Sequence, residues 1–103
     1  MKRKTYLGDE AIVAYGKISE AVSKIYDDKE LMKQFETSQM AAISEIMKKH
    51  KEEVSTILFL SIDGEIEFEN VGIYFLRLFT EYFKKFNELK NDDFFKTAVE
   101  TTK

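Results

Sequence analysis

The side chain with the clearest potential for chemistry is His50, the single histidine of this 103-residue chain. It opens the segment His50-Lys51-Glu52-Glu53-Val54, which superficially resembles a zinc-protease helix. That motif needs a glutamate directly after the first histidine and a second histidine four residues on, where this chain has Lys51 and Val54. A catalytic zinc also needs three protein ligands. We therefore expect His50 to be a solvated side chain at a helix end, and not a metal ligand.

A run of carboxylates is the second candidate for chemistry, because acidic residues occupy every second position of one short segment: Asp63, Glu65, Glu67 and Glu69. A calcium loop of the helix-loop-helix type places a glycine at its sixth position, with ligands at set offsets. Gly64 is the second residue of this segment, so the spacing does not match. We interpret the run as an acidic loop or the polar face of a strand, and we predict no metal site.

Residue types that support catalysis are scarce in the rest of the chain. Serines and threonines are scattered, and with one histidine they have no obvious general base. Cysteine is absent, which excludes a thiol nucleophile and a disulfide framework. No glycine-rich phosphate loop is present, and the net charge of −3 argues against a nucleic-acid surface. We predict a non-enzymatic protein that needs no cofactor and binds no nucleic acid.

The composition favours helices, since proline is absent and glycine occurs four times, whereas a β-sandwich or barrel normally needs many turns. The basic start of the chain is not followed by the apolar run of a signal peptide, because Gly8, Asp9 and Glu10 interrupt it. No stretch approaches the roughly 18–20 apolar residues of a membrane span. We expect a soluble, cytoplasmic protein with no membrane partner.

Apolar residues at three- to four-residue steps predict three helices in the first half of the chain. The first begins near Asp9, a good N-cap, and Asp27-Asp28 separates it from a short second helix. A third begins at Thr37 or Ser38. The residues expected to face inward on these helices are Ile12, Tyr15, Ile18, Val22, Ile25, Leu31, Met32, Phe35, Met40, Ile43, Ile46 and Met47.

The segment from Glu52 to Glu69 fits two structures. The apolar residues between Val54 and Ile62 fit a buried helix that ends at Gly64 in the left-handed conformation. The run from Thr56 to Leu60 also favours a strand, and an Asp-Gly pair followed by alternating glutamates is a hairpin signature. A helix followed by a loop and a small β-hairpin near residues 56–69 both remain open.

A long helix from Asn70 to Lys90 is the most distinctive element of the sequence. Its apolar surface is wider than the usual stripe of a little over about 100°. Asn91-Asp92-Asp93 ends it, and a last helical turn can follow at Phe94-Phe95. We therefore predict an all-α fold, a compact multi-helix domain of about five helices that forms a single domain over residues 1–103.

Aromatic residues concentrate in the second half of the chain, where ten of the fourteen lie from Phe59 onward. Most belong in the core, but a domain of this size has one core, and aromatic residues are enriched in protein interfaces. We expect part of this surface to contact a partner or a second copy. The candidate partner-binding residues are Phe75, Phe79, Tyr82, Phe86, Phe94 and Phe95.

Residues 40 to 100 resemble the small tail assembly chaperones encoded by phages and prophages of Gram-positive bacteria. The resemblance rests on the run from Ile46 to Val54 leading into Ile57-Leu58-Phe59-Leu60, and on the acidic interruption at Asp63-Gly64-Glu65. It continues with Glu69-Asn70 before the aromatic helix and with the acidic-then-phenylalanine segment from Asn91 to Ala98.

The resemblance implies a non-enzymatic helical protein that coats the tape-measure protein before the tail tube polymerises, and that is absent from the finished particle. Tape-measure helices expose apolar seams, which a chaperone would cover with an apolar groove. The alternative class is the bacteriocin immunity proteins, which are helical bundles of about this length. Their surfaces tend to be basic, which the net charge of this chain does not favour.

Overall fold

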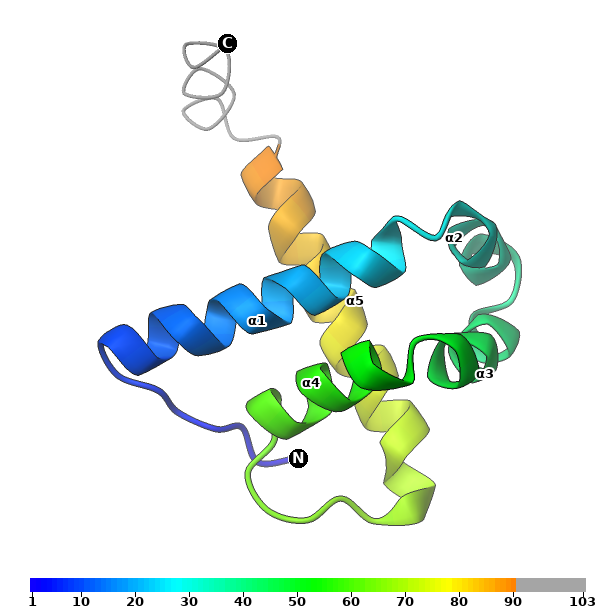
Figure 1. Ribbon diagram of the computed structural model, residues 1–103. Helices are drawn as coiled ribbons and strands as arrows, with labels where there is room; N and C mark the ends of the chain where they lie inside the picture. The colour runs from blue at the N-terminus through cyan, green and yellow to red at the C-terminus, as the bar shows by residue number, and fades with distance from the viewer. Residues whose placement is uncertain (91–103) are drawn as a thin grey trace, which may run out of the picture.

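Residues 1–90, the part of the chain that the computed structural model describes, contain five α-helices and one turn of 3₁₀ helix (Figure 1). The elements are α1 (Asp9–Tyr26), α2 (Lys29–Thr37), α3 (Gln39–Lys49), α4 (Lys51–Ser61), η1 (Phe68–Asn70) and α5 (Val71–Lys90). The predicted all-α class is confirmed. The expected turn at Phe94-Phe95 lies outside the described residues.

Among the starts of α1 to α4, the one that a side chain caps is the start of α2. The Asp28 carboxylate caps α2 by accepting a hydrogen bond of 3.4 Å from the backbone N–H of Leu31. The predicted N-cap at Asp9 is one residue off, because Gly8 occupies that position and no side chain caps the helix. Asp9 and Glu10 lie in the first turn instead, where their charges favour the positive end of the helix dipole.

The long helix α5 crosses behind α1 and α4, while α2 and α3 pack against each other at one side of the molecule (Figure 1). Because α5 contacts α1, α3 and α4, its side chains reach the centre of the fold. Phe75, Leu78 and Phe79 are almost completely buried there. The rest of the core cluster comes from the other helices: Ile18, Val22, Ile25, Leu31, Ile43, Ile46, Val54, Ile57, Leu58 and Ile62.

Of the two structures left open for residues 56–69, the helix followed by a loop is the one observed. Val54, Ile57, Leu58 and Ser61 are all buried on one face of α4, which a strand with its alternating faces would not achieve. Beyond α4, Ile62 forms an isolated antiparallel bridge with Arg3, and residues 1–90 contain no hairpin.

The expected apolar stripe of α1 is buried along only part of its length. Ile18, Val22 and Ile25 are in the core, but Ile12 is 72% exposed and Tyr15 is 45% exposed. The start of α1 projects past the end of α4, so fewer side chains are available to cover it (Figure 1). Met40, also expected to face inward, is exposed at the first turn of α3.

Candidate protein-binding site

The aromatic residues singled out on α5 are largely internal. Phe75, Phe79 and Tyr82 are buried, with exposed fractions of 0%, 1% and 6%. Phe86 is partly buried, and its ring meets that of Tyr15 edge-on at a centroid distance of 5.8 Å. These side chains therefore do not form an exposed contact surface in this structure. Phe94 and Phe95 lie outside the described residues.

The wide apolar surface of α5 is accommodated by aromatic packing from several sides. Phe79 lies 5.6 Å from Phe75 and 5.8 Å from Phe35 between ring centroids, and Phe83 lies 5.1 Å from Tyr26. Such offset and edge-on pairs stabilise a core beyond the burial of area alone. Several short helices thus cover a wide apolar surface on one long helix, which the residue pattern of α5 by itself does not indicate.

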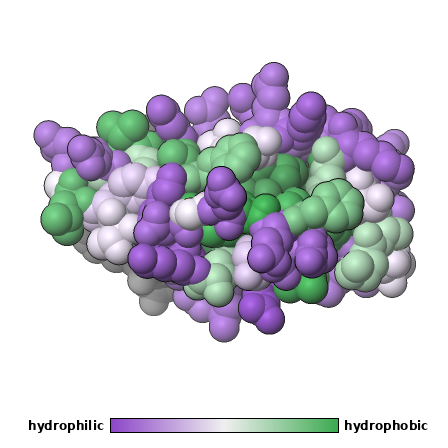
Figure 2. Space-filling model, turned by 90° about the horizontal axis from the view of Figure 1, so that it is seen from below, coloured by the Kyte–Doolittle hydropathy of each residue, from purple (hydrophilic) through white to green (hydrophobic). Residues whose placement is uncertain are grey.

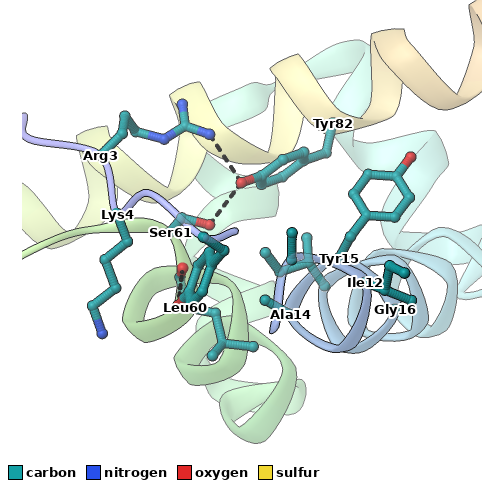
Figure 3. A pocket seen from close by; sticks show the side chains of 12 residues that line it. Arg3, Lys4, Ile12, Ala14, Tyr15, Gly16, Leu60, Ser61 and Tyr82 are labelled. Carbon is teal, nitrogen blue, oxygen red and sulfur yellow. Dashed lines mark hydrogen bonds between the residues drawn. The ribbon is translucent and has the colours of Figure 1, made fainter. Parts of the chain in front are cut away.

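An open apolar groove of about 680 Å³ lies between the segment before α1, the first half of α1, and the end of α4 (Figure 3). Its floor contains the buried residues Ala14, Ile18 and Tyr82. Ile12 and Tyr15 form its exposed wall on α1. The remaining lining residues are Arg3, Lys4, Tyr6, Ala11, Gly16, Leu60 and Ser61.

One end of the groove is polar and fully hydrogen-bonded. The Tyr82 hydroxyl accepts a hydrogen bond of 2.9 Å from Arg3 and shares another of 2.8 Å with the Ser61 hydroxyl (Figure 3). Arg3 also forms an ion pair of 2.9 Å with Glu81. Burial raises the pKa of Glu81, but hydrogen bonds from Arg3 and Lys85 outweigh that effect, so its pKa is lowered overall. This network fixes the floor of the groove.

The segment before α1 forms the second wall because its backbone and side chains bind the end of α4. The backbone N–H of Lys4 donates to the Ser61 carbonyl at 2.9 Å, and the Tyr6 hydroxyl donates to the Leu60 carbonyl at 2.8 Å. The Lys4 ammonium donates to the Phe59 carbonyl at 2.7 Å. Sequence reasoning missed this wall, since the only local signal was the short run Thr5-Tyr6-Leu7, which suggests extended backbone but not what it binds.

His50 is not the solvated side chain that the sequence predicted. It lies between α3 and α4 with 16% of its side chain exposed, and its Nε2 is 3.0 Å from Oδ2 of Asp28. The Lys49 ammonium reaches the same oxygen at 2.7 Å. Hydrogen bonds from Lys49 and then from His50 lower the pKa of Asp28 from 3.8 to about 2. This cluster joins the start of α2 to the junction of α3 and α4.

The acidic run is a loop on the surface. Asp63, Glu65, Glu67 and Glu69 are all exposed. Within the described part of the chain, no three His, Cys, Asp or Glu side chains come close enough together to hold a metal ion. The feature that the fold does form is the apolar groove with its polar end at Arg3, Ser61 and Tyr82. Such a groove is suited to holding apolar side chains of another molecule.

No protein family matches this chain, and neither a curated protein nor a solved structure matches it significantly. Among residues 1–90, no helix combines the length and the hydrophobicity that crossing a bilayer requires.

Proposed function

We propose that this chain is a non-enzymatic protein-binding module, and that the groove beside α1 receives the apolar face of a helix in its partner. The observation that carries the proposal is the exposed Ile12, which stands beside Tyr15 over a floor of buried apolar side chains. An amphipathic helix offers apolar anchors at three- and four-residue steps, which such a trough can accept.

The energetics favour a protein partner. Covering a large aliphatic side chain stabilises a complex by about 1.5–3 kcal/mol, and Ile12 has most of its surface still to cover. The hydrogen-bond network of Tyr82, Ser61 and Arg3 keeps the floor in place, so little ordering is required on binding. Arg3 and Lys4 at the edge supply the polar rim that protein interfaces usually have.

The resemblance of residues 40 to 100 to tail assembly chaperones points to one partner class, an extended helical protein such as a tape-measure protein. On this proposal the chain acts in the cytoplasm, coats apolar seams of the partner during tail assembly, and self-associates when the partner is absent. We place the contact surface at the groove and not along the aromatic stripe of α5, because Phe75 and Phe79 are buried in the core and Tyr82 is a buried residue of the groove floor.

Co-expression of tagged chain with its neighbouring genes, followed by affinity capture, tests the proposal. A long helical protein should co-purify with the wild-type chain. Ile12→Asp should weaken capture by roughly thirtyfold or more, as truncation of a central interface residue does. The matched control is Val13→Asp, which alters a neighbouring residue that is 56% exposed and does not line the groove. Equal loss in both variants, or recovery of a bacteriocin receptor instead, would reject it.

A further inference from the structure

Phe68 is the most exposed large apolar side chain in the described part of the molecule, with 93% of its surface accessible. It is held in place by local structure, since η1 contains it and the backbone N–H of Asn70 donates to the Glu67 carbonyl at 2.9 Å. Glu67 and Glu69 flank it and are exposed. Phe68 is therefore an exposed aromatic side chain between two exposed carboxylates, and we call it the knob.

The groove beside α1 is complementary to Phe68 and its flanking glutamates in both hydrophobicity and charge. It is apolar along most of its lining, and the charged side chains among its lining residues are the cations of Arg3 and Lys4. Lys4 is exposed, and among the described residues its ammonium is hydrogen-bonded to a backbone carbonyl and forms no ion pair. Its charge is thus available to a carboxylate that approaches from outside. Seen from below, the side on which Figure 1 places the loop before α5, the molecule shows hydrophobic side chains lying between projecting hydrophilic ones (Figure 2).

The knob and the groove lie at different places on the molecule. Phe68 precedes the first residue of α5, Val71, whereas the groove reaches α5 at Tyr82, about 16 Å further along the helix. The loop runs along the lower edge of the molecule to the start of α5, away from the beginning of α1 (Figure 1). Ion pairing and backbone bonds hold the loop's beginning at Lys2 and Asp63. Phe68 is therefore placed to meet another molecule.

We propose that Phe68 of one copy enters the groove of a second copy, with Glu67 or Glu69 facing Lys4. Because the two surfaces differ, the contact is head-to-tail, and each copy that binds leaves a knob and a groove open for the next. The chain then grows into short open assemblies or closes into a ring. The contact fills the groove that the proposed function assigns to a helical partner, so the partner would compete with self-association.

A single aromatic side chain buries roughly 150–250 Å², well below a stable interface, so the association is weak and reversible. We expect half-association at a concentration on the order of 10⁻⁴ M. Purified chain alone suffices for the measurement, which keeps its outcome separate from that of partner capture.

The decisive experiment mixes two exposed-site variants in sedimentation equilibrium. Ile12→Asp blocks the groove and keeps the knob, whereas Phe68→Ser removes the knob and keeps the groove. Each variant alone should remain monomeric where the wild type forms species larger than a dimer. An equimolar mixture should form a one-to-one dimer that does not grow, because only one competent knob and one competent groove remain. Circular dichroism establishes that both variants fold.

Charge-reversal variants provide a second test in the same sedimentation experiment. Lys4→Glu and the pair Glu67→Lys with Glu69→Lys should each weaken association at least threefold. Mixing the two variants should restore the larger species, because each variant's Phe68 segment then faces a groove of opposite charge. Val13→Asp should behave as wild type. The proposal fails if the wild type is monomeric at about 10⁻³ M, ten times the expected midpoint, if Phe68→Ser associates like the wild type, or if the mixture of Ile12→Asp and Phe68→Ser stays monomeric.

Discussion

The hydroxyl oxygens of Tyr82 on α5 and Ser61 on α4 lie 2.8 Å apart in a buried hydrogen bond that links residues 21 positions apart in sequence. Arg3 donates to the same tyrosine oxygen at 2.9 Å and lies 5.6 Å from the centre of its ring. Three separate segments of the chain thus meet at one phenol. The position of the groove depends on this meeting point, because the segment before α1 and the end of α4, which both line the groove, are attached there.

Replacing Tyr82 with phenylalanine tests that dependence. The Ser61 hydroxyl, on a residue that is 3% exposed, would lose its partner, and a buried group left without one costs about 1–3 kcal/mol. Urea denaturation should show Tyr82→Phe to be less stable by about 1–2 kcal/mol. Adding Ser61→Ala should recover part of the loss, since no unpaired hydroxyl then remains. Strictly additive losses would argue against the bond.

Two phenylalanines of opposite exposure provide a second prediction. Phe75→Ala should lower the free energy of unfolding by about 3–5 kcal/mol, because the ring is fully buried and leaves a cavity. Phe59→Ala should change it by less than about 0.5 kcal/mol, because the ring is 63% exposed. Denaturant midpoints measure both. Comparable effects would mean that α4 and α5 pack differently from the arrangement described.

The pH dependence of stability should report on Asp28. Its pKa is lowered to about 2 by Lys49 and His50, so its stabilisation is present above about pH 4 and is lost as pH falls toward 2. Asparagine caps helices as well as aspartate does, so Asp28→Asn removes the charge and keeps the cap. We expect a deficit of about 1 kcal/mol at pH 7, a moderate value because Lys49 is exposed to solvent.

That deficit should shrink toward zero between about pH 4 and pH 2, as wild-type Asp28 becomes protonated. Asp27→Asn, at the adjacent exposed position, is the matched control and should show no comparable deficit. Thermal unfolding at several pH values measures both variants. A deficit for Asp28→Asn that is as large at pH 2 as at pH 7 would assign the effect to something other than the ion pairs.

Two glycines should respond in opposite directions to alanine. Gly64 has a φ of +94°, which side chains rarely adopt, so Gly64→Ala should destabilise the protein by about 1 kcal/mol. Gly16 lies inside α1 with open space around the position of an added Cβ, so Gly16→Ala should stabilise it by about 0.5–1 kcal/mol. For a domain of this size each effect shifts the melting temperature by several degrees, roughly 4–8 °C per kcal/mol. Shifts of equal sign would contradict the assigned backbone.

The helices could be predicted from the sequence because their signals are local. Three- and four-residue spacing put Ile18, Val22 and Ile25 on one face of a helix, and the same spacing put Phe75 and Phe79 on one face of another. Those faces are the ones that the core buries. The absence of proline removed one common cause of a break within a helix. The two aspartates before Lys29 marked a helix start that Asp28 does cap.

The candidate site could not be predicted in the same way, because it is made by contacts between distant segments. His50 meets Asp28 across 22 residues, and Lys4 meets Ser61 across more than half the chain. Neither of these two contacts can be inferred from the spacing of residues along the sequence. The groove appears only when the segment before α1 binds the end of α4 and when α5 brings Tyr82 beneath them.

The sequence by itself determined that this chain is helical, where most of its helices run, and which stripe of each is apolar, since a helix follows from interactions within a few residues; whether residues 56–69 form a helix or a hairpin was decided by the tertiary structure. Tertiary structure alone decided how much of each stripe is covered. Ile12 and Ile18 belong to one predicted stripe, yet the first is exposed and the second is buried. The physical reason is that burial depends on where the neighbouring helices end, and α4 ends before it reaches the start of α1.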